Sequence, residues 1–358
     1  MMKKKAIFAG LLLLVLVTAC GVQTPTAPVQ EEAAEELIVM THDSFAVSAE
    51  VIAQFESENK VKVQFVKGGD AGAALNRLIL TSLAGTPEAD VFFGLDNTFL
   101  SRALENDLFE PYAAPALAEI PANFKLDPQN RALPIDYGDV CINYDKAWFV
   151  SKSLPLPQSL ADLTMPIYEG LLVVENPATS SPGLSFFLAS VAEFGESGWQ
   201  TWWQALRDNG VVVVSDWETA YYTNFSASSG RGSQPMVVSY ATSPAAELIY
   251  AETPLEESPT GSIVADGTCW RQIEFAGILK GSPKRALAEK LIDFMLSKPF
   301  QEDVPLQMFV FPVLPSAALP EEFTRASAVP AKPASLDPQV IAAQRDAWLR
   351  DWTDLMLK

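Results

Sequence analysis

The sequence predicts an α/β protein of two lobes, with mostly parallel sheets that carry helices on both faces. Short apolar runs alternate along the chain with amphipathic helical patterns, which is typical of parallel sheets covered on both faces. About 320 residues follow the N-terminal segments, which is more than one hydrophobic core usually holds. Polar residues gather in the loops after the apolar runs, where ligands of such sheets bind.

The N-terminus has the pattern of a lipoprotein export signal. Three lysines at positions 3–5 precede an apolar run over 6–17, which is too short for a membrane span, and V-T-A-C follows, ending at Cys20. We expect residues 1–20 to be the signal peptide, with Cys20 lipidated on the outer face of the cell membrane or in the periplasm. An ordinary signal with a chance cysteine is the alternative. Residues 21–36 are rich in glutamate and proline and predict a flexible linker.

Charge and composition exclude several classes of partner. The formal net charge is −19, and loss of the three signal lysines makes it −22, which argues against nucleic acid and against an anionic lipid face. The acidic balance mildly favours a cationic ligand. One histidine and three cysteines are too few for a typical zinc site, so no metal is expected. Cys141 and Cys269 lie in strand-like segments outside the cytoplasm, where a disulfide and two buried free thiols are both open.

The first part of the chain, residues 37–137, predicts three strand and helix units of the first lobe. The expected strands are 37–41, 61–66 and 90–95, and the expected helices are 46–58, 71–83 and 97–104. A long run from residue 133 crosses to the second lobe, for which we expect 138–274. Its predicted strands are 171–174, 211–215 and 236–241, and its predicted helices are 182–194, 199–207, 218–225 and 244–251. A return to the first lobe over 275–358 begins with a strand at 272–279 and carries helices at 284–296 and 337–357.

Two strand-to-helix corners of the second lobe could hold an anion. In the segment 176–183, hydroxyls stand before a helix whose first turn contains proline, and 239–244 repeats the arrangement. A plain helix cap is the alternative for each corner. Trp217 follows a third strand and is placed to stack on a flat ring, although tryptophans more often pack in cores. In the first half, Asp43, Asp70, Asp96 and Asp136 follow apolar runs, where they face a cationic ring, a metal or only helix N-termini.

Several of these segments resemble the thiamine-binding proteins of ABC importers. The resembling motifs are T-H-D-S-F at 41–45, L-N-R-L at 75–78, A-D-V-x-x-G-L-D-N at 89–97, D-Y-G at 136–138, T-S-x-P-G-L at 179–184, S-Y-x-T-S-P-A at 239–245 and A-A-Q-R-x-A-W at 342–348. They run in order over roughly nine-tenths of the chain, and the last two are the more specific. The resemblance implies a two-lobe type II periplasmic-binding-protein fold that closes on its ligand in a cleft between the lobes.

The resemblance also implies a set of ligand contacts. Carried over by position, they are Asp70, Ala71, Ser180, Ser181, Trp217, Tyr240, Ala241, Thr242, Ser243 and Pro244. Two positions depart from the family: His42 stands where the family has tyrosine, and Phe309 stands where it has tryptophan. Both keep a flat ring. A protonated His42 beside a thiazolium ring would be unfavourable, so we expect weaker thiamine binding at acidic pH.

The implied ligand is thiamine, thiamine monophosphate or thiamine diphosphate, delivered by a lipid-anchored monomer to a membrane permease, with no cofactor. The alternative within the same fold is a ferric-iron protein, because Tyr221 and Tyr222 resemble a tandem tyrosine pair that ligates iron, or a polyamine-binding or sugar-phosphate-binding protein. A helical reading separates the two tyrosines by about 100°. An extracellular hydrolase is the alternative of another class. No nucleophile elbow, Walker loop or G-x-G-x-x-G motif supports an enzyme.

Overall fold

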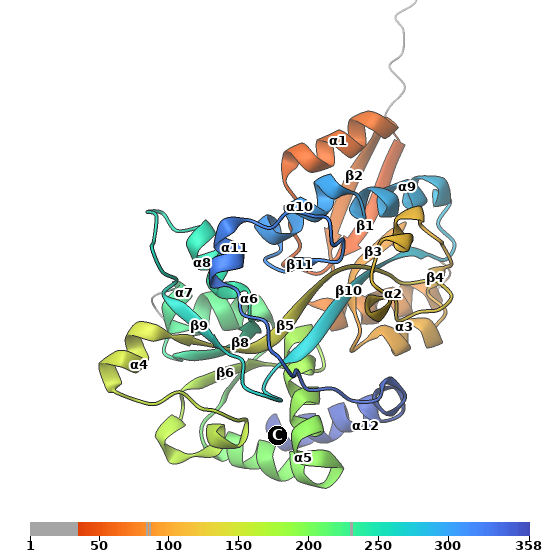
Figure 1. Cartoon of the computed structure of the whole chain (residues 1–358). Coiled ribbons are helices and arrows are strands. Elements are labelled where there is room, and N and C mark those ends of the chain that lie inside the picture. The colour runs from red at the N-terminus through yellow and green to blue at the C-terminus, as the bar shows by residue number, and fades with distance from the viewer. Residues whose placement is uncertain (1–34, 84, 86, 230–231) are drawn as a thin grey trace, which may run out of the picture. The chain divides into compact units, whose positions relative to one another are not determined.

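The fold is built on one mixed β-sheet. The computed structural model describes residues 35–358 except 84, 86, 230 and 231, and within these residues eleven strands form a single sheet. The main strand order is β2-β1-β3-β10-β5-β8-β6-β7 (Figure 1). Residues 35–358 form one compact unit with its own hydrophobic core. The predicted signal peptide, its lipidation site Cys20 and linker residues 21–34 lie outside the described residues.

One end of the sheet is parallel and comes from the first part of the chain. Its strands are β1 (Glu35–Thr41), β2 (Val61–Lys67) and β3 (Val91–Asp96), and its helices are α1 (Ala49–Asn59), α2 (Ala71–Leu83) and α3 (Leu100–Glu105). β1 pairs in parallel with both β2 and β3. The three predicted strand and helix units are therefore confirmed, although α1 and α3 each start three residues later than expected. Glu35 and Glu36 belong to β1 rather than to the linker.

The other end of the sheet is also parallel. Its strands are β6 (Leu172–Glu175), β7 (Val212–Val214) and β8 (Met236–Tyr240), with α4 (Lys146–Lys152), α5 (Ser181–Asp208), α6 (Trp217–Thr219), a π-helical turn η5 (Ala220–Asn224), α7 (Ser226–Ser229) and α8 (Ser243–Ile249). The two helices expected at 182–194 and 199–207 are confirmed, because α5 consists of two helices that meet at a kink at Gly195 (φ 70°). One expectation was wrong in detail. The helix expected at 218–225 is one α-turn followed by the π-helical turn.

Two long strands join the parallel ends. β5 (Leu133–Asp145) and β10 (Trp270–Leu279) pair antiparallel in the middle of the sheet (Figure 1), because the chain crosses once in each direction. The short strands β4 (Phe109–Glu110), β9 (Thr260–Ile263) and β11 (Phe311–Pro312) pair with them. The remaining elements are η1 (Pro115–Ala118), η2 (Ala122–Phe124), η3 (Ala161–Thr164), η4 (Pro166–Tyr168), α9 (Arg285–Met295), α10 (Lys298–Gln307), α11 (Glu321–Ala326) and α12 (Pro338–Met356).

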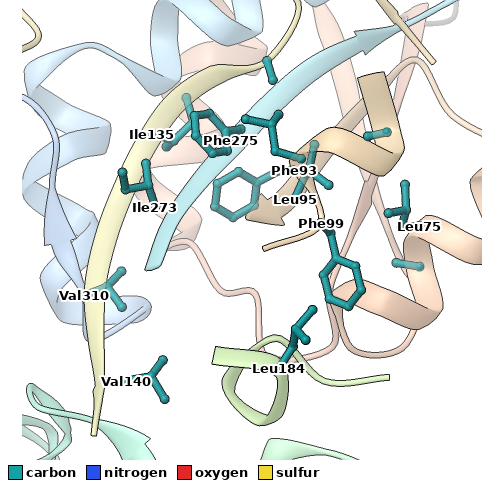
Figure 2. Packing of buried hydrophobic residues seen from close by; sticks show 14 of the residues in the cluster. Leu75, Phe93, Leu95, Phe99, Ile135, Val140, Leu184, Ile273, Phe275 and Val310 are labelled. Atoms are coloured by element: carbon teal, nitrogen blue, oxygen red, sulfur yellow. The ribbon is translucent and has the colours of Figure 1, made fainter. Parts of the chain in front are cut away.

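The core continues along the two crossing strands. Figure 2 shows Ile135 of β5 and Ile273 and Phe275 of β10 with Phe93 and Leu95 of β3, and all five side chains are buried. Burial of side chains of this size contributes roughly 1.5–3 kcal/mol each. The acids that alternate with them in sequence, Asp136 and Glu274, are therefore held in place by core neighbours on both sides.

The C-terminal helix α12 ties the two parallel ends together. It packs on both α5 and α3, and α5 and α12 lie side by side in Figure 1. Trp348 and Trp352 meet Phe187 and Trp203 of α5 with ring centroids 6.4 and 5.4 Å apart. Arg345 is buried and donates to the Ser101 hydroxyl at 3.2 Å. The A-A-Q-R-x-A-W motif thus has a packing role at a distance from the loops that hold the ligand-binding motifs.

A disulfide links Cys141 of β5 to Cys269, the residue before β10, with the Cα atoms 4.3 Å apart. Of the two states left open by the sequence, the structure has the paired one. Both cysteines are fully buried beside Ala241. In the part of the chain that the structure describes, no helix has both the length and the hydropathy of a membrane span.

Candidate functional site

Loops from both parallel ends of the sheet surround one cavity of about 850 Å³, counting the solvent at its mouth. This volume lies in the range of small-molecule sites. The lining residues are His42, Ser44, Asp70, Ala71, Ser181, Pro182, Trp217, Glu218, Tyr221, Tyr222, Tyr240, Ser243, Ala246, Glu274, Gln307, Met308, Phe309 and Val310. Eight predicted contacts are among them, which are His42, Asp70, Ala71, Ser181, Trp217, Tyr240, Ser243 and Phe309.

One wall of the cavity is aromatic. The Trp217 ring stacks on Tyr221 with centroids 5.1 Å apart and an interplanar angle of 19°. Tyr222 and Tyr240 contact the Trp217 ring in edge-to-face arrangements, with interplanar angles of 79° and 65°. Trp217 Nε1 donates to Ser239 Oγ at 2.9 Å, which fixes the indole in its plane. Flat π-faces held in this way suit a heteroaromatic ring, and they attract a cation that lies over them.

Two glycines bring rings of the site close to the sheet. At Gly138 of β5, an added Cβ would stand 2.7 Å from Cδ1 of Tyr240, so only glycine lets this ring lie flat against the strand. At Gly94 of β3, φ is +99° and an added Cβ would stand 2.3 Å from Cδ2 of His42. Glycine is therefore required at position 94 both by the backbone conformation and by the approach of the imidazole.

Asp70 joins the two sides of the cavity. It precedes α2 on one side, and its Oδ2 accepts from the backbone N–H of Trp217 on the other side at 3.3 Å. Burial raises the pKa of Asp70 to about 6, although the Ser180 hydroxyl, His42 and the Trp217 amide each favour the charged form. This carboxyl is therefore poised to change its charge when its surroundings change.

The base His42 and the acid Glu274 form an ion pair in the site. His42 Nε2 lies 3.7 Å from Glu274 Oε2, and both side chains are almost completely buried. Burial lowers the pKa of His42, but the carboxylates of Glu274, Asp70 and Asp43 outweigh this effect, so that the pKa is raised overall. Glu274 was not among the residues singled out by the sequence. The available signal was a single acid inside the otherwise apolar strand 273–279.

Phe309 lies at the rim in a left-handed conformation, with φ of 56°, which is costly for a residue with a side chain. The Thr242 hydroxyl donates to the Phe309 carbonyl and holds this turn. The Phe309 ring meets Tyr250 edge-on at 5.2 Å, and the Tyr250 hydroxyl donates to the Leu306 carbonyl at 2.7 Å. The rim is thus built from the end of α8 and the turn after α10.

The serine hydroxyls expected in the segment 176–183 do lie at the start of α5. Ser181 and Pro182 line the cavity, and Ser180, the residue before the helix, makes no side-chain cap bond to it. The first N–H groups of a helix lack partners within it and attract anions. The predicted contacts Ser180, Ala241, Thr242 and Pro244 do not line the cavity. Ser180 lies behind Ser181 against Asp70, Ala241 packs beside the disulfide, Thr242 holds Phe309, and Pro244 is buried in the first turn of α8.

The tandem tyrosines differ from each other in environment. Tyr221 is buried and donates to Glu247 Oε1 at 2.7 Å, whereas Tyr222 is half exposed, and their rings cross at 84°. Tyr221 therefore serves the aromatic wall, a role that the sequence missed because η5 was expected to be an ordinary helix. Over the described residues, no group of three or more histidine, cysteine, aspartate or glutamate side chains is arranged to hold a metal ion.

Comparison with known proteins defines the class of protein. A model of the family described as bacterial extracellular solute-binding protein matches residues 86–330, and the chain belongs to this family. Its fold is that of the type II periplasmic binding proteins, which confirms the predicted fold class. The family transports solutes, and its members capture them outside the cytoplasm.

Individual relatives of this chain include thiamine-binding proteins and an iron uptake protein. The chain is 32% identical to the thiamine-binding periplasmic protein of Salmonella typhimurium (strain LT2) over 88% of this chain and 92% of the relative. It is similar to a solved periplasmic thiamin binding protein with a TM-score of 0.78 and 29% identity, over 90% of this chain and 96% of the other. Iron uptake protein A1 of Synechocystis sp. (strain PCC 6803) is 24% identical over 85% of this chain and 83% of the relative.

Proposed function

We propose that this protein captures thiamine or a thiamine phosphate in the cavity and delivers it to the membrane permease of an ABC importer. The observation that carries the proposal is the stacked pair Trp217 and Tyr221 facing a cavity that also contains Glu274 and Asp70. Thiamine offers a flat aminopyrimidine for stacking and a thiazolium cation for the acids. The named relatives at about 30% identity support the same ligand.

The aromatic wall and the acids act on different parts of such a ligand. Stacking of a flat ring on an aromatic side chain is worth about 1–3 kcal/mol. A cation over the Trp217 or Tyr240 face gains about 0.5–2 kcal/mol more, depending on how far it is desolvated. Ser181 and the backbone N–H groups at the start of α5 would receive the hydroxyl or phosphate tail. Thiamine, its monophosphate and its diphosphate would therefore differ in the contacts that their tails make with Ser181 and the start of α5.

Capture is coupled to closure in the mechanism we propose. The lobes would be 37–137 with 275–358 and 138–274, joined by β5 and β10. A ligand that bridges them would shift the population toward the closed form. The backbone bond from Trp217 to Asp70 is one contact that closure would make. The diacylated Cys20 would keep a monomer close to its permease and so raise its effective concentration there.

Ferric iron is the second candidate, because Tyr221 and Tyr222 line the cavity and an iron uptake protein is among the relatives. The bond from Tyr221 to Glu247 and its stacking on Trp217 favour the aromatic role instead. A ligand-to-metal absorption band on addition of ferric iron would support the iron assignment. Its absence, together with tight thiamine binding, would remove that assignment.

Calorimetric titration of residues 35–358 tests the proposal directly. The protein is unfolded and refolded first so that no carried-over ligand occupies the cavity. We expect one-to-one, sub-micromolar binding of thiamine or of one of its phosphates. A folded sample that gives no heat with all three compounds would refute the ligand assignment and leave the fold untouched.

A further inference from the structure

Three buried acids form a row across the middle of the sheet. In the strand register, Glu274 of β10 stands opposite Asp96 of β3 on one side and opposite Asp136 of β5 on the other. The exposed fractions are 0% for Asp96, 5% for Glu274 and 0% for Asp136. Like charges directly opposite each other on neighbouring strands are destabilising, and burial makes the repulsion stronger.

The row lacks the partners that three carboxylates would need. Glu274 Oε1 accepts from Gln272 at 3.0 Å, and Asp96 Oδ1 accepts from Thr98. Across the described part of the chain, no donor bonds to Glu274 Oε2, Asp96 Oδ2 or either oxygen of Asp136. Two facing carboxyl groups satisfy each other only if one of them carries a proton.

Among the described residues, the row forms one ion pair, and its partner is an imidazole. None of the ion pairs in this part of the chain joins a lysine or an arginine to the three acids, and His42 pairs with Glu274. The other titratable neighbour of Glu274 is the phenol of Tyr240 on β8, which is neutral. Burial and the neighbouring Glu274 raise the pKa of Asp136 well above its usual range, and burial raises that of Asp96 to about 6.

Only the middle acid reaches the cavity. Glu274 lines it, whereas Asp96 and Asp136 lie behind it on the neighbouring strands. A cation that enters the cavity therefore meets the one carboxyl of the row that has an acid on each side. Its charge would stabilise a second negative charge in the row, which a proton on one of the acids would otherwise remove.

We infer that Glu274, backed by Asp96 and Asp136, selects the positive charge of the ligand, and that ligand binding expels a proton from this row of acids. The inference rests on the proposed function, because thiamine supplies the cation. It assigns Glu274 as a specificity-determining residue: a neutral ring of the same shape would stack on the aromatic wall but would leave the proton in place. Uptake of the cation and release of the proton thus become one linked equilibrium.

Calorimetry in buffers of different ionisation enthalpy measures the released protons. At pH 7 we expect roughly half to one proton per thiamine bound, and none for the analogue in which a neutral thiophene replaces the thiazolium. Asp136→Asn and Glu274→Gln are expected to abolish the release, and Glu274→Gln to weaken thiamine about 10- to 100-fold while changing the affinity for the neutral analogue little. Asp266→Asn makes the same chemical change at an exposed position of the 35–358 unit and serves as the control.

Two variants and an infrared spectrum show whether the released proton comes from the row of acids or from the imidazole of His42. In His42→Tyr the release is expected to persist, and its loss there would assign the proton to the imidazole and overturn the inference. Infrared spectra of the ligand-free protein should show the C=O band of a buried carboxylic acid that disappears in Asp136→Asn and on thiamine binding. Thiamine binding without proton release and with an unchanged band would overturn the inference and leave the proposed function standing. A folded protein that binds neither thiamine nor its phosphates would refute the proposed function, while the band still reports whether the row holds its proton.

Discussion

Replacement of Trp217 by alanine should weaken thiamine binding without unfolding the protein. The indole stacks on Tyr221 at 5.1 Å and donates to Ser239 at 2.9 Å, and it is only partly buried. Ser239 keeps a second hydroxyl partner in Ser243 at 2.9 Å, so that the truncation leaves no buried hydroxyl unpaired. The main loss is therefore the stacking face that the proposed ligand would use.

The magnitude follows from the geometry of that face. Loss of ring stacking together with part of a cation–π contact removes about 2–3 kcal/mol, which corresponds to a Kd roughly 30- to 140-fold weaker. Trp217→Phe keeps a ring and loses the bond to Ser239, worth about 0.5–1.5 kcal/mol. Its Kd should therefore rise only about 2- to 12-fold.

The assay is calorimetric titration of the two variants beside Trp148→Ala, which makes the same truncation at the start of α4, away from the cavity-lining residues. Thermal melting checks that each variant is folded. The reasoning would be refuted if folded Trp217→Ala bound thiamine within threefold of the wild type, or if Trp148→Ala weakened binding equally.

Three further changes test how the site is supported. Gly94→Ala places a Cβ against His42 in a left-handed backbone, so we expect about 1–3 kcal/mol lower stability in denaturant titration; unchanged stability would contradict that packing. Replacing Cys141 and Cys269 with serine opens a loop of 128 residues and should cost about 2–5 kcal/mol, and the loss should match that of the reduced wild type. Because burial raises the pKa of Asp70 from 3.8 to about 6, the folded protein keeps a proton that the unfolded chain loses first. Stability should therefore fall as pH rises from about 4 to 6, and Asp70→Asn should flatten this slope in melts across that range.

The sequence was sufficient for the fold because its signals are local. Apolar runs such as 37–41 and 236–241 identify buried strands wherever they pair, and strand and helix alternation then implies the parallel ends of the sheet. Trp217 and Tyr240 were singled out for the same reason: Trp217 follows β7, Tyr240 ends β8, and ligands bind beyond strand ends. The kink at Gly195 falls between the two helices expected at 182–194 and 199–207, because the helical pattern of the sequence is interrupted at this glycine.

The residues that the sequence missed depend on pairing between distant strands. Glu274 and Asp136 are 138 positions apart by number, and only the register of β10 against β5 shows that they face each other. Asp136 was recognised as an acid after an apolar run, yet nothing local reveals that Glu274 separates it from the cavity. Likewise, Thr242 carries a predicted motif position, but its hydroxyl holds Phe309 instead of lining the cavity. Motif positions therefore identify the loops of this site better than the atoms that touch the ligand.

Two features of the site carry a cost in stability. Phe309 is held in a conformation that costs of order 1–3 kcal/mol, and Glu274 is buried between two other acids. Under the proposed function, a flat cation would contact the Phe309 ring and the Glu274 carboxyl, which both line the cavity. A neutral ligand would leave Glu274 without a counter-charge. The same residues would then select for charge and planarity, so affinity and selectivity should change together when these residues are altered.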